Sequence, residues 1–267
     1  MAQLKHLVIT SFAPDHWNTH AQRCVRSFLE KWPCPLVIYY EEKQPPPFEL
    51  PNLPNFYQVD LMQRPVMRRW METYHKDART QGKKANSDEL NFRFMADKFC
   101  RKVFAITDAA EQFEADYLWW LDADTLTHET ITTSWLEALI RPKDYLCFLG
   151  RSGYSHSECG FMGWRTQHPA HKMFMARYRA IYETGQFFQE QEWHDSYLFD
   201  VVRKKMEWEG HFTATDLSPS PRGHVFVESI LGTKMDHLKG TVNKKVGKTV
   251  RKQRIRISHS EKYWQEE

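Results

Sequence analysis

Residues 117–126 read YLWWLDADTL, a run of large apolar residues that ends in two carboxylates one residue apart. The apolar run is typical of a buried strand, and the abrupt change to acidic residues marks its exposed carboxyl end. Open α/β sheets bind their ligands at this end of their strands. We therefore take this segment as the centre of an α/β fold and of its functional site.

The two aspartates of this segment suit a divalent cation. Side chains alternate across an extended strand, so Asp122 and Asp124 can project to the same side and share a hard cation through oxygen ligands. The structural alternative is an Asp-rich turn that caps a helix at Thr125 or Thr127, and an isolated D-x-D pattern fits it about as well. The preceding apolar run favours the metal-binding interpretation.

The composition indicates a globular domain. The chain has 267 residues, of which 41% are hydrophobic, which is enough for one large domain with a real core. No run approaches the roughly 18 apolar residues of a membrane span. Five scattered cysteines without a C-x-x-C pair indicate neither a disulfide framework nor a structural zinc site. These features predict a soluble, cytoplasmic protein with reduced thiols.

The net charge of +3 hides two basic clusters. One lies between residues 64 and 84, and the other, between residues 234 and 262, sets ten lysines and arginines against Asp236 and Glu261. A single cluster of this kind is usually a solvated surface. Two of them in a nearly neutral chain indicate a polyanionic partner, either a phosphate-bearing donor or a nucleic acid.

The N-terminal part predicts a βαβ unit and therefore a parallel sheet. Hydrophobic periodicity predicts strands at residues 6–10, 36–40 and 56–60, with a helix between the first two. The second of these strands ends in Glu41 and Glu42. A proline-rich surface loop is expected at residues 44–54.

The remaining elements follow from the same periodicities. We expect helices at residues 61–86, 90–113, 127–139, 170–182 and 195–206, and strands at residues 145–149 and 158–164. In the second helix, Arg93, Lys98 and Lys102 are expected to supply surface charge. Gly160 and Gly163 interrupt the last strand, where they would permit close approach of backbone or ligand.

Two further clusters carry chemistry. Glu192, His194 and Asp195 come just before a predicted helix, where a carboxylate can transfer a proton or stabilise positive charge. Asp195 could instead be only a helix N-cap. In the second cluster, His237 can bind a metal next to lysines that can neutralise phosphate, and Gly240 permits a tight turn.

The order of these features along residues 5–245 resembles the GT-A nucleotide-sugar glycosyltransferases. The matching features are Thr10-Ser11-Phe12 after the first strand, the basic helix from Arg93 to Lys102, Leu121-Asp122-Ala123-Asp124, the glycine-containing strand, the acidic turn from Glu192 to Ser196, and Asp236-His237-Leu238-Lys239-Gly240. The C-terminal element is similar to the histidine-x-x-glycine-x-x-lysine of glycogenin-like and lipopolysaccharide-type enzymes and to the histidine-leucine-lysine-glycine turn of phage-encoded ones. This chain departs from the former by placing Lys244 one residue later.

The resemblance implies a mixed, mainly parallel sheet flanked by helices in one catalytic domain over residues 1–267. Its nucleotide-sugar-binding half would span residues 5–126, and its acceptor and catalytic half residues 127–247. A basic tail would follow at residues 248–267. If the chain is phage-encoded, its place is the host cytoplasm.

The resemblance also implies roles for individual residues. Asp122, Asp124 and His237 would hold Mn²⁺ or Mg²⁺ against the diphosphate of a nucleotide-sugar, with a UDP-sugar as the first candidate and Asp122 nearer the ribose. Glu192 and Asp195 would face the sugar and the acceptor as catalytic residues. The other donor-binding residues would be Thr10, Phe12 and Tyr39 near the base, together with Arg93, Lys98, Lys239 and Lys244.

The acceptor is expected to be a hydroxyl group, and the basic tail with the phage-like motifs favours a 5-hydroxymethylated pyrimidine in DNA. The tail could hold the DNA backbone electrostatically, while the modified base leaves the stack to reach a pocket. A cell-surface or capsular glycan is the alternative, because tryptophans and tyrosines can stack on a sugar as well as on a base.

A haloacid-dehalogenase-like phosphatase is the competing enzyme class. In that class the first aspartate, here Asp122, attacks phosphate and the second, here Asp124, handles the leaving-group proton. That motif usually begins the core domain, whereas a βαβ unit precedes it here, and no pair of acids downstream completes a magnesium site. A non-catalytic nucleic-acid-binding protein would leave the acidic clusters unexplained.

Overall fold

The computed structural model describes residues 4–41, 55–83 and 90–249. The proline-rich loop expected at residues 44–54, and the basic tail from residue 250 onward, lie outside the described residues. None of the helices in the described ranges is long and apolar enough to span a bilayer.

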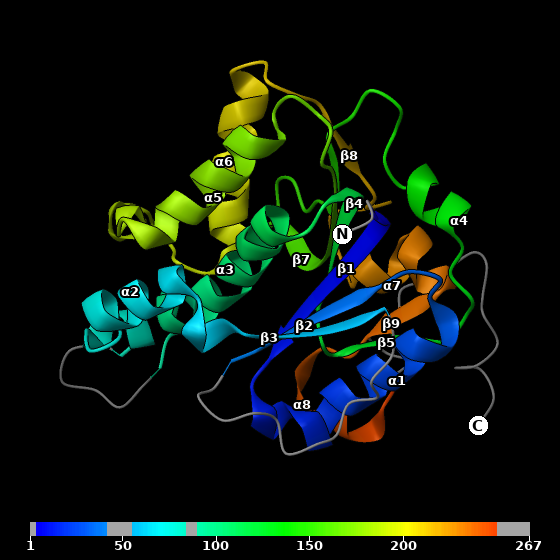
Figure 1. The fold of residues 1–267 in the computed structure, drawn as a ribbon, viewed down its shortest axis with the longest axis horizontal. Coiled ribbons are helices and arrows are strands. Elements are labelled where there is room, and N and C mark those ends of the chain that lie inside the picture. The colour runs from blue at the N-terminus through cyan, green and yellow to red at the C-terminus, as the bar shows by residue number, and fades with distance from the viewer. Residues whose placement is uncertain (1–3, 42–54, 84–89, 250–267) are drawn as a thin grey trace.

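A seven-stranded sheet runs through the middle of the molecule in the order β3-β2-β1-β4-β7-β6-β8 (Figure 1). The first four of these strands are parallel to one another, β7 is antiparallel to both of its neighbours, and β8 is parallel to β6. This confirms the mixed, mainly parallel sheet. The strands are β1 (Leu4–Phe12), β2 (Leu36–Tyr40), β3 (Phe56–Asp60), β4 (Ala115–Leu121), β6 (Leu146–Leu149), β7 (Glu158–Arg165) and β8 (Ala214–Asp216).

Helices cover both faces of the sheet and bury its alternating side chains in two cores. In β1, Leu7 and Ile9 belong to one core, and Val8 belongs to the other. The first core is covered by α2 (Pro65–Tyr74), α3 (Ala96–Gln112), α5 (His171–Glu183) and α6 (Asp195–Trp208), which gather on one side in Figure 1. The second is covered by α1 (Gln22–Lys31), α4 (Thr133–Ala138) and α7 (Val225–Glu228), and α8 (Gly240–Val246) follows near the end.

A two-stranded ribbon, which the sequence did not predict, connects the centre of the chain to its end. Its strands β5 (Thr125–Thr127) and β9 (Met235–His237) are antiparallel, with Thr125 opposite His237. The helix predicted at residues 127–139 was therefore wrong at its start. It begins only after Thr132, whose hydroxyl accepts a hydrogen bond from the backbone of Trp135.

Two other predicted helices are shorter than expected. Within residues 61–86 the α-helix is limited to α2, and Gly82, at φ 74°, ends the short turn that follows. Within residues 90–113 the α-helix is α3, preceded by a turn at Phe92–Phe94. Lys102, expected to be a surface charge of this helix, is buried beside the carboxyl ends of the strands.

Candidate active site

A cavity of about 340 Å³ lies where the parallel strands end. Ser11 and Phe12 come from the end of β1, Glu41 follows β2, and Asp122 follows β4. Parallel strands bring their carboxyl ends to one edge of the sheet, so residues distant in sequence line the same space. We call this space the first cavity.

Three potential metal ligands meet in the first cavity. One ligand atom from each of Asp122, Asp124 and His237 lies within 4.8 Å of the others. The His237 Nε2 atom is 3.0 Å from Asp124 Oδ1 and 3.7 Å from Asp122 Oδ2. Two carboxylates and one imidazole fit Mn²⁺ or Mg²⁺, both of which accept oxygen-rich ligand sets. The ribbon explains the convergence, because the backbone N–H of Leu238 donates to the carbonyl of Asp124 at 2.9 Å.

The glycines of β7 make room for two large side chains, His237 of the site and Trp119 of the core. A Cβ on Gly160 would lie 2.7 Å from Cε1 of His237, and one on Gly163 would lie 2.2 Å from Cζ3 of Trp119. The close approach expected at these glycines is therefore that of two side chains. Gly160 lets the imidazole lie against the strand, which supports the fit of His237 as a ligand.

The charges of the cluster depend on one another. Burial alone would raise the pKa of Asp124, but His237 and then Lys244 outweigh it and hold that pKa well below its usual range. Burial alone would lower the pKa of His237, but Asp124 outweighs it and raises that pKa. Asp124 is thus ionised and pairs with a proton on the imidazole, which a bound cation would replace.

Lys102 connects three elements at the base of the cavity. Its Nζ lies 2.8 Å from Asp122 Oδ1, 2.9 Å from Asp195 Oδ2 and 2.6 Å from the carbonyl oxygen of Cys159. Burial opposes its charge, but the two aspartates raise the pKa of Lys102 above its usual value. Burial likewise opposes ionisation of Asp195, but Lys102 lowers its pKa. Asp195 is therefore ion-paired, and the N-cap of α6 is His194.

The structure brings some of the other predicted donor residues to the first cavity and leaves others away from it. Phe12, Lys98, Lys239 and Lys244 line it. Lys244 Nζ lies 2.7 Å from Asp124 Oδ2, and Lys239 pairs with Glu158.

Besides Arg93, two predicted donor residues, Thr10 and Tyr39, do not line this cavity. Both side chains are fully buried. The Tyr39 hydroxyl donates to Asp108 of α3 at 2.8 Å. Strand alternation accounts for this position, because it turns Tyr39 into the core beneath α3 rather than toward the edge of the sheet.

A second cavity, of about 460 Å³, adjoins the first. The two share Phe99, Glu158, Asp195 and Lys239 among their lining residues. Glu192 and Arg93, both predicted from sequence, line the second cavity and not the first.

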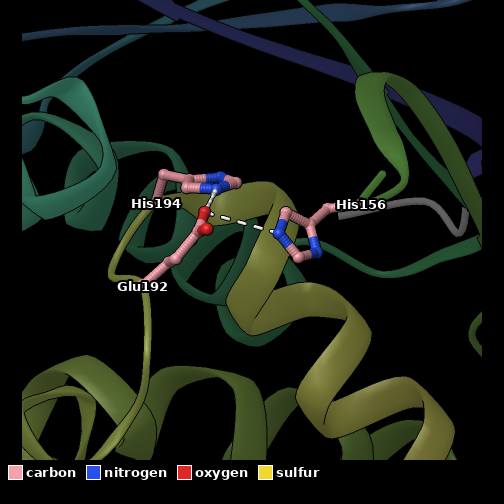
Figure 2. Close-up of side chains that lie close together, drawn as sticks. All are labelled: His156, Glu192 and His194. Atoms are coloured by element: carbon pink, nitrogen blue, oxygen red, sulfur yellow. Dashed lines mark hydrogen bonds and ion pairs between the residues drawn. The ribbon is translucent and has the colours of Figure 1, made fainter. Parts of the chain in front are cut away.

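Glu192 is surrounded by donors in the second cavity. Figure 2 shows the imidazoles of His156 and His194 directed at its carboxylate. The His194 Nε2 atom is 2.8 Å and the His156 Nε2 atom 3.4 Å from Glu192 Oε2. Arg93 approaches the other oxygen at 3.2 Å.

Several cavity residues were missed from the sequence. Lys102 was taken for a surface charge, because helical periodicity cannot show that a lysine next to apolar positions meets two carboxylates from other elements. Glu41 could have been found, since it follows a predicted strand as Asp122 does. His156 and Glu158 gave no such indication, because they belong to a loop and to the start of a strand whose neighbours are distant in sequence.

No protein-family model and no curated protein matches the chain. Among solved structures, a glycosyltransferase involved in the glycosylation of the major capsid of PBCV-1 is 11% identical, with a TM-score of 0.48 over 91% of this chain and 99% of that one. Mouse xyloside xylosyltransferase 1 is 10% identical, with a TM-score of 0.45 over 81% and 86%. The bifunctional glycosyltransferase WbbM is 10% identical, with a TM-score of 0.47 over 90% of this chain and 46% of that one. Similarity this low supports no conclusion about activity, which must come from the site itself.

Proposed function

We propose that this protein is a metal-dependent glycosyltransferase that moves a sugar from a nucleotide-sugar to a hydroxyl acceptor. A UDP-sugar is the first candidate for the donor. The observation that carries the proposal is the convergence of Asp122, Asp124 and His237 in a cavity at the carboxyl ends of the strands. Open α/β folds bind nucleotides at this place. The order of motifs that resembles the GT-A enzymes supports the same conclusion.

The charge of the first cavity explains why a metal is needed. Four lysines and five carboxylates line it, so with neutral histidines the carboxylates are in excess by one charge and disfavour a diphosphate. A divalent cation reverses this balance to an excess of one positive charge. When bound, it would neutralise the donor diphosphate and the charge that develops on the leaving nucleoside diphosphate.

Different residues of the chain would contact the different parts of the donor. Lys239 and Lys244, next to the metal ligands, would contact the diphosphate. Phe12, at the end of β1, would contact the base. Asp195 lines both cavities and is ionised, so it would stabilise the positive charge that develops on the transferred sugar. Glu192 would face the acceptor.

Transfer forms one bond and breaks another at the anomeric carbon. The acceptor oxygen bonds to this carbon while the bond from the carbon to the diphosphate breaks, and the diphosphate leaves with the electron pair. The hydroxyl proton would pass to a base beside the acceptor if the configuration inverts, or to the departing phosphate if it is retained.

The phosphatase alternative fits the site less well. It requires the Asp122 carboxylate to attack phosphate, but Oδ1 of Asp122 accepts hydrogen bonds from Lys102 at 2.8 Å and from Trp120 Nε1 at 2.6 Å. The third ligand group at the site is the imidazole of His237 rather than a downstream acid.

The test is a thermal-shift and hydrolysis screen of UDP-, GDP- and CMP-sugars with and without Mn²⁺. We expect one nucleotide class to stabilise the protein only when Mn²⁺ is present. If no nucleotide-sugar has an effect while a simple aryl phosphate is hydrolysed, the proposal fails and the phosphatase interpretation takes its place.

A further inference from the structure

The lining of the second cavity is balanced in charge. Arg93, Arg151 and Lys239 face Glu158, Glu192 and Asp195. Each of these cations is already paired. Arg93 lies 3.2 Å from Glu192, and Arg151 lies 3.4 Å from Glu158. Lys239 also pairs with Glu158. Nucleic-acid binding depends on cations that neutralise backbone phosphates. Because the positive and negative charges of this lining cancel, a polyanion gains no net attraction here, so this cavity suits an uncharged ligand.

Exposed aromatic side chains gather at the same cavity. Phe92 is 60% and Tyr154 57% exposed, and they line the cavity from separate segments of the chain. Such exposure of large apolar groups marks a binding surface when the groups cluster. An aromatic ring can cover the C–H face of a sugar ring while the hydroxyls at its rim stay free for hydrogen bonds.

The cluster in Figure 2 supplies the hydrogen bonds. His194 Nδ1 accepts from the backbone N–H of Tyr197 at 3.3 Å, so the ring proton is assigned to Nε2, which donates to Glu192. A metal ion on Nε2 would require the proton to move to Nδ1, against that N–H group. The cluster is therefore better suited to hold Glu192 as an acceptor for hydroxyl groups than to bind a metal.

His156 completes this polar side of the cavity. One of its ring nitrogens approaches Glu192, and the other points away from it (Figure 2). The His156 side chain is 33% exposed, so it can meet a ligand. A carboxylate and an imidazole side by side can accept from and donate to neighbouring hydroxyls of one sugar.

We infer that the second cavity binds the acceptor and that this acceptor is a neutral glycan. Its sugar ring would stack on Phe92 and on the face of Tyr154 opposite Arg222, whose guanidinium carbon lies 4.4 Å from the ring centroid. Its hydroxyls would bond to Glu192 and His156. The inference rests on the proposed function and selects the glycan over hydroxymethylated DNA. It adds His156 and the two aromatic residues to the binding residues.

Saturation-transfer NMR with a panel of neutral methyl glycosides tests the inference, in the presence of UDP and Mg²⁺. We expect ring protons of at least one glycoside to receive saturation, with little change as salt rises. Phe92→Ala and Tyr154→Ala should each weaken that binding by up to about tenfold. Glu192→Gln should weaken it while leaving UDP binding unchanged. The matched control is Trp208→Ala, since Trp208 is 89% exposed and lines neither cavity.

The other outcomes separate this inference from the proposed function. If UDP binds with Mg²⁺ but no glycoside does, or if the aromatic variants bind the glycoside as the wild type does, the inference alone is overturned. Preferential, strongly salt-dependent binding of a hydroxymethylcytosine duplex, weakened by the same variants, would overturn it in favour of DNA. Zn²⁺ binding lost on His156→Ala would make the cluster a metal site. If no nucleotide-sugar binds with any divalent cation, the proposed function fails and the inference with it.

Discussion

Asp124 lies between two nitrogen partners, His237 Nε2 at 3.0 Å and Lys244 Nζ at 2.7 Å. Asp124→Asn keeps the size of the side chain but removes the charge that a cation needs. We expect metal-dependent turnover of the nucleotide-sugar to fall by about 10²-fold or more, with a loss of about 1–3 kcal/mol in unfolding free energy because His237 and Lys244 lose their charged partner. Donor hydrolysis with and without Mn²⁺, and thermal unfolding, measure the two effects.

The control for this substitution is Asp116→Asn, at the amino end of β4, the strand that precedes Asp124. It removes the same charge, but Asp116 lines neither cavity. Full metal-dependent activity in Asp124→Asn would remove Asp124 from the ligand set.

Gly160 and Gly163 allow metal binding and stability to be separated. Gly160→Ala places a methyl group 2.7 Å from His237, so we expect weaker Mn²⁺ binding as the imidazole is displaced. Gly163→Ala places one 2.2 Å from buried Trp119, so we expect a loss of about 1–3 kcal/mol in unfolding free energy with metal binding retained in the folded protein. Mn²⁺ titration and urea unfolding of both variants measure this. Equal Mn²⁺ affinity in wild type and Gly160→Ala would contradict the assignment of His237.

At this scale the sequence was most informative where a residue type has few uses. The change from an apolar run to two carboxylates predicted that Asp122 and Asp124 lie at the end of a strand, and both line the first cavity. Their binding of a cation stays a prediction. Tyr39 was expected at the cavity and Lys102 at the surface, and neither residue lies where it was expected. Each position depends on partners from other elements, namely Asp108 for the tyrosine and two aspartates for the lysine.

Among the elements, α3 carries Lys102, whose ammonium group pairs with carboxylates from two other parts of the cavity. Lys102→Met would leave Asp122 and Asp195 without their shared cation. We expect a loss of about 3 kcal/mol in unfolding free energy, at the lower end for a broken buried pair because Asp122 is partly exposed. Urea denaturation measures this loss.

Lys98→Met, one turn earlier on α3, is the matched control. Lys98 also lines the first cavity, but its side chain is exposed, so we expect a change within about 0.5 kcal/mol. Equal losses in the two variants would mean that the buried pairs of Lys102 contribute nothing particular to stability.

The long elements were predictable and the short ones were not. Strands β1, β2 and β4 and helices α5 and α6 follow periodicities that extend over several turns or pleats. The three-residue strands β5 and β9 carry too few residues for a pattern, and they exist only because they pair with each other. The helix that was wrongly predicted to begin at Thr127 shows that the local sequence alone does not identify such a short strand.

Across the whole molecule, buried histidines set the response to acid. Burial lowers the pKa of His20, His171 and His224 to about 4 each. In the unfolded chain they titrate near 6.5, so between these values the unfolded state binds more protons and stability falls as pH falls. The slope reaches about 1.4 kcal/mol per pH unit for each histidine.

His171→Asn should reduce that slope by up to about 1.4 kcal/mol per pH unit, because asparagine does not titrate and its oxygen can accept from the Tyr145 hydroxyl, which lies 3.0 Å from His171 Nδ1. Urea unfolding between about pH 6.5 and pH 4 measures the slope. An unchanged slope in the variant would show that His171 takes up its proton in the folded state.

The architecture as a whole was predictable from its N-terminal βαβ unit. A βαβ beginning fixes the parallel half of the sheet and therefore the edge at which a ligand binds. What local patterns could not predict is how the antiparallel half closes the site, since that depends on pairings between segments far apart in the chain.

The β5–β9 ribbon has a consequence for the order in which the protein is made. Asp124 and His237 are 113 positions apart, so one proposed metal ligand leaves the ribosome long before the other. Domains begin to fold from the N-terminal side during synthesis, and contacts across long loops form late because closing the loop costs entropy. A nascent chain that has already paired β1, β2 and β4 still lacks the imidazole. The proposed cation site, and with it the donor site, would therefore be completed only after His237 has emerged.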